Sequence, residues 1–578
     1  MAPEPKAADA AAFATLTELL LHRAAGQADD PAYIVLSDRG HEEASITYGE
    51  LAVRAAVMAR RLAARAAPGD RALLVCPNGL DFMVGFLGCL LAGIIAVPMM
   101  VPRRQSARDA ANSIVADCTP RLALAPSGLI AGQRGDVVGR FAGAGLEWLA
   151  IDEAETSDAA PSSNPAPDPD AIAFLQYTSG STSAPKGVMV SQAGLMANLG
   201  MIRIAFGNTS HSAYVSWVPL YHDMGLVINA LQGLYLGARC VLMAPVGFMQ
   251  RPWVWLRAIS EYGAEVAGAP NFAFDLCVER YRPEQMQGVD LSGWKLAFNG
   301  AEPVRADTIR RFAETFAPHG FSASAMYPAY GMAEATVLIS AGRRGSGPQI
   351  GSVSRSGLQH HIAGPATEAG DAQDVVGSGQ ALAGSRIAIV DPESRQRLPA
   401  GQVGEIWAAG PHIARGYWCN PAASDAAFRA RITGEDENIW LRTGDLGFMD
   451  AAGELFVTGR IKEILIIRGA NHYPQDIEHT VQSCHPALRA HGGAAFTVSD
   501  SQAAEKLVVV QEIARTYRKD IVPDEIVARI REAIVNEHEI VPHAIALLRP
   551  GALPQTTSGK IQRSLSRQLW LAGSLDRL

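Results

Sequence analysis

Apolar positions along the first two hundred residues follow two alternating patterns, one helical and one extended. Leu16–Ala25 and the segment from Ile46 to about Ala66 repeat apolar residues every three to four positions, which predicts amphipathic helices. Arg71–Cys76 and Ala171–Leu175 are short apolar runs, which predict buried strands. Helices that alternate with strands in this way indicate a layered α/β fold with a parallel sheet.

One stretch is long and apolar enough to be tested as a membrane span. Phe82–Pro102 contains no charged residue. Three glycines interrupt it, however, and prolines follow at its end. We therefore expect a buried helix over Asp81–Ala92, a stop at Gly93 and a short strand over Ile94–Val97. The sequence thus predicts no membrane span.

Length and charge narrow the possible classes of protein. A chain of 578 residues is too long for one compact core, so two or more domains are expected. The formal net charge of −8 provides no basic surface, and we expect no nucleic-acid partner. The seven cysteines are scattered singly, which favours a reducing compartment and argues against structural zinc. Because residues 1–9 lack the features of a secretory signal, a cytoplasmic location is expected.

Gln176–Ser191 contains a run of hydroxylated residues and glycine between two apolar segments. Hydroxyls and accessible backbone N–H groups suit a polyphosphate, and a nearby lysine adds a positive charge. The alternative is an ordinary solvent-exposed loop. A Walker-type loop would need Gly-Lys-Ser/Thr at the start of a helix. A serine-hydrolase Ser-x-x-Lys pair would need a helical turn that Pro185 and Gly187 disfavour. The candidate phosphate ligands are Thr178, Ser179, Gly180, Ser181, Thr182 and Lys186.

This stretch resembles the phosphate-binding loop of the adenylate-forming superfamily, which includes acyl-CoA synthetases, luciferases, peptide-synthetase adenylation domains and fatty acyl-AMP ligases. The resemblance implies a large N-terminal region of layered α/β subdomains with a β-barrel-like part. A small, mobile α+β C-terminal domain is expected to follow it. We accordingly expect domains over residues 1–459 and 460–578.

Two segments resemble the carboxylate and acyl sites of the superfamily. Residues 216–226 are similar to the motif whose histidine or aromatic residue gates the carboxylate site, which implicates His222; the alternative is a satisfied core histidine. Residues 267–274 resemble the acyl-pocket wall, although such residues would equally fill a core. The acyl-pocket candidates are Trp217, Ile228, Leu231, Pro270, Asn271, Phe272 and Phe274.

Two further segments resemble the adenine and metal sites. In the superfamily, a loop like residues 295–303 lies along the adenine, and Tyr330 offers a flat face for the purine. Glu334 would give a hard carboxylate oxygen to Mg²⁺ on the phosphates, although a single loop glutamate is usually solvated surface. The adenine-site candidates are Asn299, Gly300, Ala301, Tyr330, Gly331 and Met332. Ala333 replaces the threonine of ordinary acyl-CoA synthetases, and fatty acyl-AMP ligases carry alanine there.

The last motifs concern the ribose, the hinge and the C-terminal lysine. Asp445, in a turn that ends a strand, would accept hydrogen bonds from ribose hydroxyls; an Asx-turn is the alternative. Residues 458–463 resemble the family hinge, in which Arg460 reaches the ribose or phosphate and Lys462 is the pivot. Lys560 matches the mobile-domain lysine that binds between the carboxylate and the α-phosphate, although exposed C-terminal lysines commonly serve solubility.

The glycine-rich segment 342–384 resembles the insertion that distinguishes fatty acyl-AMP ligases; its composition alone would favour disorder. The resemblance implies a fatty acyl-AMP ligase that uses ATP and Mg²⁺ to convert a fatty acid to acyl-adenylate. The acyl group would then pass to the phosphopantetheine thiol of a separate acyl carrier protein, often in polyketide or lipopeptide synthesis. The alternatives are a fatty acyl-CoA synthetase and a non-catalytic acyl- or nucleotide-binding relative.

Overall fold

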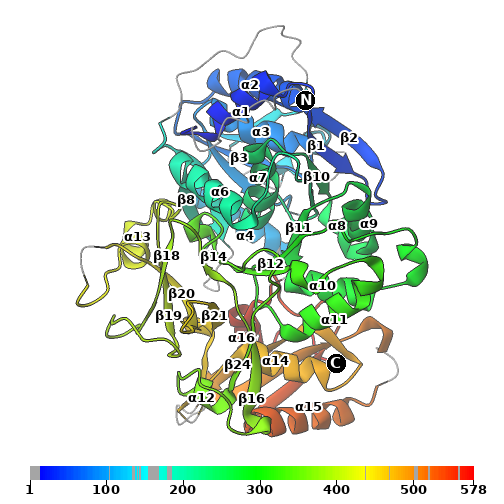
Figure 1. The fold of residues 1–578 in the computed structure, drawn as a ribbon, viewed down its shortest axis with the longest axis vertical. Coiled ribbons are helices and arrows are strands. Elements are labelled where there is room, and N and C mark those ends of the chain that lie inside the picture. The colour runs from blue at the N-terminus through cyan, green and yellow to red at the C-terminus, as the bar shows by residue number, and fades with distance from the viewer. Residues whose placement is uncertain are drawn as a thin grey trace.

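The fold is taken from a computed structural model of the chain (Figure 1). The structure describes residues 13–102, 105–132, 137–139, 141, 145–153, 168–178, 185–435, 438–467, 469–499, 505–517, 521–556 and 560–578. The N-terminal helices lie at one end of the long axis and the C-terminal elements at the other (Figure 1).

Two large sheets organise the N-terminal part within the described ranges. The smaller has six strands, parallel except for its last pair: β6 (Glu147–Ala150), β5 (Leu122–Ala125), β3 (Arg71–Val75), β4 (Ile95–Met99), β7 (Ile172–Thr178) and β8 (Lys186–Ser191). The larger has nine strands in the order β17 (Gln380–Ala381), β14 (Ser340–Ala341), β13 (Met326–Tyr330), β12 (Leu296–Gly300), β11 (Val266–Pro270), β9 (Tyr214–Ser216), β10 (Cys240–Met243), β1 (Pro31–Leu36) and β2 (Glu42–Thr47). The predicted layered α/β architecture is confirmed.

Helices pack on these sheets and join their strands. They include α1 (Leu16–Gly26), α2 (Tyr48–Ala63), α3 (Leu80–Leu91), α4 (Gln105–Cys118), α5 (Ser127–Ile130), α6 (Gln192–Phe206), α7 (Gln232–Leu236), α8 (Pro245–Gln250), α9 (Trp253–Glu261), α10 (Asn271–Glu279) and α11 (Ala306–Phe316). Helix α13 (Pro421–Phe428) packs instead against the antiparallel sheet described below. A π-helix, η3 (Met224–Leu231), precedes α7.

The uncharged stretch is a core helix followed by a core strand, as predicted. Helix α3 is buried along most of its length. Its Gly88 faces α2 so closely that a Cβ there would lie 2.8 Å from the Cβ of Met58, so only glycine allows this helix pair to approach. Among the described residues, no helix combines the length and the apolar character needed to cross a bilayer.

The start of α2 differs from the sequence prediction. Ile46 lies in β2, opposite Tyr33 of β1, instead of opening a helix. The helix begins at Tyr48 because Thr47 caps it: the Thr47 hydroxyl accepts the Glu50 N–H at 3.2 Å, and the Glu50 carboxylate accepts the Thr47 N–H at 3.0 Å. This reciprocal capping box fixes the strand-to-helix boundary.

A third, antiparallel sheet follows, with strands β18 (Arg386–Val390), β19 (Gly404–Ala409), β20 (Leu441–Met449) and β21 (Leu455–Arg460). The glycine-rich segment packs against it as β15 (Ile350–Ser354), α12 (Arg355–Gln359) and β16 (Ala372–Val376). Val353 and Leu358 are buried in one cluster with Phe448, Phe456 and Tyr473. The segment is therefore ordered over these elements. Its composition alone would favour disorder, but its few apolar side chains are buried.

The C-terminal part surrounds a sheet of its own, at the lower end of Figure 1. Its elements are β22 (Leu465–Ile467), β23 (Ala470–His472), α14 (Pro474–Ser483), β24 (Leu488–Ser499), β25 (Glu505–Ile513), α15 (Pro523–His538), β26 (Ala544–Leu548) and α16 (Arg563–Leu571). Strands β24, β25 and β26 form the sheet, and residues 465–547 supply a separate hydrophobic core. The division into domains 1–459 and 460–578 remains a prediction.

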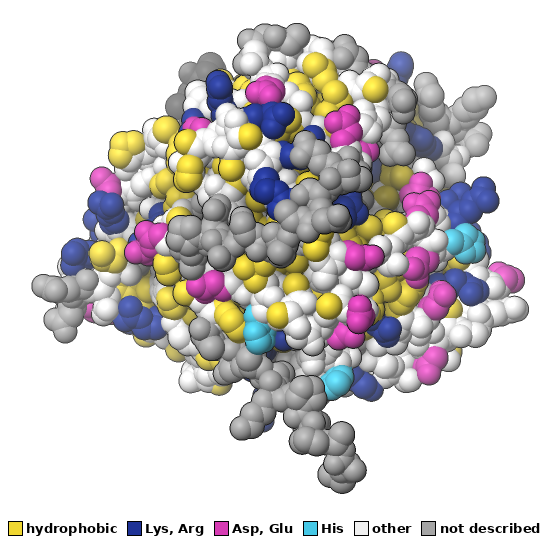
Figure 2. Space-filling model, turned by 90° about the horizontal axis from the view of Figure 1, so that it is seen from above, with side chains coloured by type: hydrophobic (Ala, Val, Ile, Leu, Met, Phe, Trp, Pro, Cys, Tyr) yellow, Lys and Arg dark blue, Asp and Glu magenta, His cyan; other side chains and the backbone are white. Residues whose placement is uncertain are grey.

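The surface seen in Figure 2 carries lysine and arginine side chains interspersed with aspartate and glutamate. On that face no single sign of charge dominates. This mixed surface accords with the absence of a basic signature in the sequence.

Candidate functional site

A cavity of about 1790 Å³ lies where the N-terminal sheets, the antiparallel sheet and the C-terminal part meet. Residues from every predicted motif line it, although up to several hundred positions separate them in the sequence. The predicted site residues on its wall are Thr178, Lys186, His222, Ile228, Asn271, Gly300, Ala301, Tyr330, Gly331, Met332, Glu334, Asp445, Arg460, Lys462 and Lys560. Ser179, Gly180, Ser181 and Thr182 lie outside the described residues.

Lys186 and Glu334 lie near each other on the cavity wall, because both contact Tyr417. Strands β7 and β8 are antiparallel neighbours and place Thr178 opposite Lys186. Glu334 lies on a short 3-10 turn, and its carboxylate accepts the Tyr417 hydroxyl at 2.8 Å. Burial raises the pKa of the Glu334 carboxyl, and this hydrogen bond partly offsets the rise. Glu334 is thus a buried carboxylate with a defined partner, in contrast to a solvated surface residue.

His222 occupies the wall beside η3. Its Nδ1 lies 2.6 Å from Asp223 Oδ1, and the same carboxylate oxygen accepts the Met224 N–H at 2.7 Å, at the start of η3. Burial alone would raise the pKa of the Asp223 carboxyl, but His222 and Lys560 outweigh burial and lower it. The ionised Asp223 therefore fixes the orientation of the His222 ring at the cavity wall.

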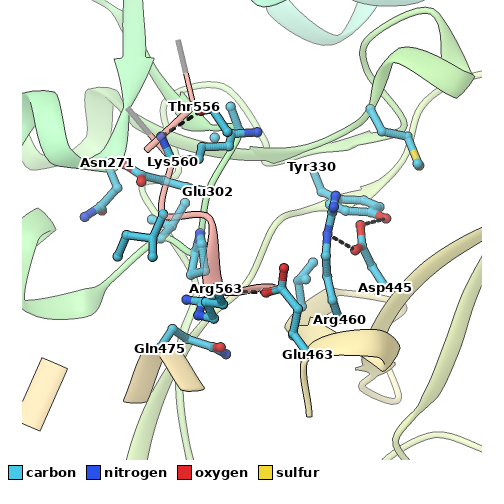
Figure 3. Close-up of a pocket in the computed structure, with 18 of the residues that line it drawn as sticks. Asn271, Glu302, Tyr330, Asp445, Arg460, Glu463, Gln475, Thr556, Lys560 and Arg563 are labelled. Carbon is cyan, nitrogen blue, oxygen red and sulfur yellow. Dashed lines mark hydrogen bonds and ion pairs between the residues drawn. The ribbon is translucent and has the colours of Figure 1, made fainter. Parts of the chain in front are cut away.

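Lys560 enters the cavity from the C-terminal part. Its backbone N–H donates to the Thr556 hydroxyl at 3.0 Å. Figure 3 shows Lys560 beside Glu302 and Asn271, across the cavity from Tyr330, Asp445 and Arg460. Burial lowers the pKa of the Lys560 ammonium, as does Arg460.

Glu302 was missed by the sequence reasoning. Its carboxylate accepts the Phe272 N–H at 2.6 Å, and burial raises its pKa. It follows Gly300 and Ala301 directly in the predicted adenine loop, so its position in that loop was the available signal.

Asp445 and Arg460 face each other on neighbouring strands. The register of β20 and β21 pairs the two residues, and Arg460 Nε lies 2.9 Å from Asp445 Oδ1. The Tyr330 hydroxyl donates to the other carboxylate oxygen at 2.9 Å. The charge of Asp445 raises the pKa of Arg460. Figure 3 shows the three side chains together.

The setting of Asp445 differs from the prediction in one respect. It lies within β20, which continues to Met449, and not in a turn that ends the strand. Gly444 adopts a positive φ of 73°, and a bulge follows between Leu446 and Gly447. The strand therefore bends at this point without ending.

The adenine loops are closely packed. A Cβ on Gly331 would lie 1.7 Å from the Val337 carbonyl oxygen, and one on Gly300 would lie 2.7 Å from the Ala329 carbonyl oxygen. Glycine is required at both positions. Asn299, in contrast, is wholly buried and does not line the cavity; its Nδ2 donates to Asn271 Oδ1 at 3.2 Å. Because successive side chains along β12 point to opposite faces of the sheet, Asn299 points away from the face on which Gly300 lines the cavity.

Several predicted acyl-pocket residues lie elsewhere. Trp217, Leu231, Pro270, Phe272 and Phe274 do not line the cavity. Trp217 stacks on Phe248 with ring centroids 3.9 Å apart, and Phe274 packs edge-on against Trp255 and Phe312. These aromatic rings form a core cluster. Of the predicted set, Ile228 does lie on the apolar wall of the cavity, together with Phe206, Met224, Phe298, Val337 and Leu338.

The family model for AMP-binding enzymes matches residues 20–418, which is more than half of the chain. The chain belongs to the AMP-binding enzyme family. The C-terminal residues 462–578 of this AMP-binding enzyme match a second model, described as the AMP domain of Disco-interacting protein 2-like proteins.

Individual relatives cover almost the whole enzyme. It is 39% identical over 574 residues to the medium-chain-fatty-acid acyl-carrier-protein ligase JamA of Moorena producens, with 98% of this chain and 96% of JamA covered. Among solved structures, the fatty acid AMP ligase of Legionella pneumophila matches with a TM-score of 0.76 and 37% identity, covering 99% of this chain and 98% of that one. A fatty acyl-adenylate ligase of L. pneumophila in complex with acyl adenylate and pyrophosphate matches with a TM-score of 0.75, 37% identity and the same coverage. The predicted adenylate-forming fold is confirmed, and the chain is an adenylate-forming ligase.

Proposed function

We propose that this enzyme joins a fatty acid to the AMP moiety of ATP, releases pyrophosphate, and transfers the acyl group to the phosphopantetheine thiol of a separate acyl carrier protein. The observation that carries the proposal is the convergence of three groups on one cavity: Lys186 with Glu334, Asp445 with Arg460, and His222 with Lys560. An apolar wall adjoins them, which suits an acyl chain. The names of the relatives support the same reaction.

The first step requires positioning more than a protein nucleophile. A carboxylate oxygen of the fatty acid attacks the α-phosphorus of ATP, and the bond to pyrophosphate breaks. His222, held by Asp223, borders the carboxylate. The Lys560 ammonium stabilises the negative charge that builds up on the α-phosphate. Asp445 and Arg460 hold the ribose, and Lys186 holds the departing phosphates.

The residues present fit a magnesium ion carried by the nucleotide. Within the described ranges, no cluster of three or more His, Cys, Asp or Glu residues could hold a metal without a ligand's help. Mg²⁺ in nucleotide sites is typically held by one or two carboxylates together with phosphate oxygens and water. Glu334, a buried carboxylate beside Lys186 at the phosphate end, would serve as this single protein ligand. The bound ion would offset phosphate charge.

The second step transfers the acyl group. The thiol sulfur attacks the carbonyl carbon of the acyl-adenylate, AMP leaves with the electrons of the anhydride bond, and the thiol proton passes to solvent. We propose that residues 460–578 rotate about Lys462 between the two steps. Lys462 lies on a 3-10 turn, η9 (Ile461–Glu463), directly after β21, where the chain passes into the C-terminal part.

One assay series tests the proposal. The purified enzyme would be incubated with ATP, Mg²⁺ and a panel of fatty acids, with pyrophosphate release followed and products identified by mass spectrometry. A holo-carrier protein would serve as acceptor, with the apo form, which lacks the thiol, as the matched control. We expect acyl-AMP in every active reaction and an acylated carrier only with the holo form. Absence of pyrophosphate release with every fatty acid would refute the proposal, and acyl transfer to CoA alone would identify an acyl-CoA synthetase.

A further inference from the structure

Tyr417 contacts both Lys186 and Glu334, the two charged residues proposed to hold the phosphates and the metal ion. Its hydroxyl donates to Glu334 Oε1 at 2.8 Å. The Lys186 ammonium lies over the same aromatic ring, 4.5 Å from its centroid, which is a cation–π contact. All three side chains line the cavity. One tyrosine therefore contacts both a cation and an anion through different parts of its side chain.

The position of the Tyr417 ring is fixed by its backbone. The chain around Tyr417 pairs with β8: Val188 and Tyr417 form an isolated bridge, and the Trp418 N–H donates to the Gly187 carbonyl at 2.7 Å. The Tyr417 N–H donates to the Ser424 hydroxyl at 2.9 Å. The ring edge packs against Phe428, with centroids 5.1 Å apart. The ring is thus held at a set distance from the strand that carries Lys186.

Tyr417 also keeps the two charges apart. Lys186 and Glu334, both described residues, make no direct ion pair, because the tyrosine ring lies against the ammonium and its hydroxyl against the carboxylate. In a direct ion pair, the two charges would neutralise each other. With Tyr417 between them, the ammonium remains available to a phosphate and the carboxylate to a cation.

We propose that Tyr417 is a positioning residue for the magnesium-bound polyphosphate, orienting Glu334 through its hydroxyl and Lys186 through its ring. This inference rests on the proposed function. Its two contacts can be separated by substitution. Tyr417→Phe keeps the aromatic face and removes the hydroxyl, whereas Tyr417→Leu removes both.

The test is calorimetric binding of ATP without fatty acid, once with Mg²⁺ and once with a chelator. The quantity compared is the gain in ATP affinity that Mg²⁺ produces. A hydrogen bond to a charged group contributes about 1.5–3 kcal/mol, so Tyr417→Phe should reduce this gain by about tenfold or more. Tyr417→Leu should in addition weaken ATP binding in the chelator by about threefold or more, because the cation–π contact is lost.

Tyr281→Phe is the matched control. It also removes a tyrosine hydroxyl that bonds a side chain, at 3.1 Å from His319 Nε2, but Tyr281 does not line the cavity. It should leave both affinities unchanged. The proposal fails if Tyr417→Phe retains the parental gain from Mg²⁺, or if Tyr281→Phe loses as much. Should Tyr417→Leu not fold, Tyr417→Phe alone decides. These outcomes can be distinguished from an error in the proposed function itself. In that case the parent enzyme would release no pyrophosphate.

Discussion

His491 Nε2, on β24 of the C-terminal part, lies 3.3 Å from Asp275 Oδ2, on α10 of the N-terminal part. His491 also lines the cavity. Asp275 is buried, and the Thr308 hydroxyl donates to the same carboxylate oxygen at 2.9 Å. Burial would lower the pKa of His491, but Asp275 and Glu302 outweigh burial and raise it, while Arg305 opposes them.

This pair should make the contact between the two parts dependent on pH. The pKa of folded His491 is raised above the unfolded value of about 6.5, so its contribution is fully present below pH 6.5 and is lost as pH rises through the folded pKa. A double-mutant cycle of Asp275→Asn and His491→Gln, measured by urea unfolding, should give a coupling free energy of about 1 kcal/mol at pH 6. The coupling should be near zero at pH 9; equal values at both pH values would contradict the assignment.

Lys560 should be required for adenylation but not for nucleotide binding. Loss of one preorganised charged donor typically costs about 10²–10³-fold in rate, so Lys560→Ala should slow single-turnover acyl-AMP formation by that factor. The affinity for ATP should change little, because most of the residues proposed to bind the nucleotide lie in the N-terminal part. Lys295→Ala, which removes an exposed lysine outside the cavity wall, is the control. Near-parental adenylation by Lys560→Ala would exclude this role.

Phe298 should limit the length of the acyl chain. Its ring lies so close to β11 that a Cβ on Gly268 would be 2.3 Å from it, and it stacks on Phe206 with centroids 6.0 Å apart. Phe298→Ala would open space at this apolar wall. Each buried methylene contributes about 0.8 kcal/mol. For a fatty acid two methylenes longer than the one the parent enzyme prefers, kcat/KM should therefore be about tenfold higher in Phe298→Ala than in the parent.

Phe274→Ala is the control for this substitution. Phe274 is also a buried phenylalanine, but it packs in the aromatic core cluster and does not line the cavity. It should lower the free energy of unfolding by about 3–5 kcal/mol and leave the chain-length profile unchanged. A shifted profile in Phe274→Ala, with none in Phe298→Ala, would instead support the acyl-pocket residues predicted from the sequence.

The sequence was most informative where a short motif carries its own chemistry. His222, Asp445 and Lys560 each stand in a distinct local pattern, and the fold places all three on the cavity wall. The ends of helices and strands were predictable to within one or two residues where a glycine or proline ends the element, as after α3. Ile46 was misplaced because a capping box, which depends on Thr47 and Glu50 together, competes with helical periodicity.

The remaining site residues depend on contacts between distant segments. Tyr417 reaches Lys186 only because the loop that carries it pairs with β8, more than two hundred residues earlier in the chain. Phe298 and Phe274 are both buried phenylalanines. Only the tertiary packing determines that Phe298 faces the cavity and Phe274 does not. Periodicity identifies both as buried but does not say what each one faces.

Polar contacts made by Arg355, Gln373 and Asn471 join the glycine-rich segment to the C-terminal part. Arg355 Nη2 lies 3.1 Å from Glu537 Oε2, and Gln373 Nε2 donates to Asp476 Oδ2 at 3.0 Å. Asn471 Nδ2 donates to the Gln359 carbonyl at 2.9 Å. These contacts hold the C-terminal part in the arrangement in which Lys560 reaches the cavity.

The same contacts should oppose the opening that CoA requires. A half-exposed polar side chain paired across such a boundary contributes roughly 0.5–1 kcal/mol, so Arg355, Gln373 and Asn471 together bias the closed arrangement by about 2 kcal/mol, or about thirtyfold. The intact enzyme should therefore form acyl-AMP with little acyl-CoA. The triple substitution Arg355→Ala, Gln373→Ala and Asn471→Ala should raise acyl-CoA formation by about ten- to thirtyfold while preserving the buried side chains of the segment.

Arg310→Ala provides the control for the triple substitution. Arg310, on α11, pairs with Asp374 of the same segment at 2.6 Å, but the contact lies within the N-terminal part. Its removal perturbs the segment without releasing the C-terminal part, so acyl-CoA formation should stay at the parental level. Acyl-CoA and acyl-AMP would be quantified by mass spectrometry at saturating CoA. Rapid acyl-CoA synthesis by the intact enzyme, or equal gains from Arg310→Ala and the triple substitution, would show that these contacts do not select the acceptor.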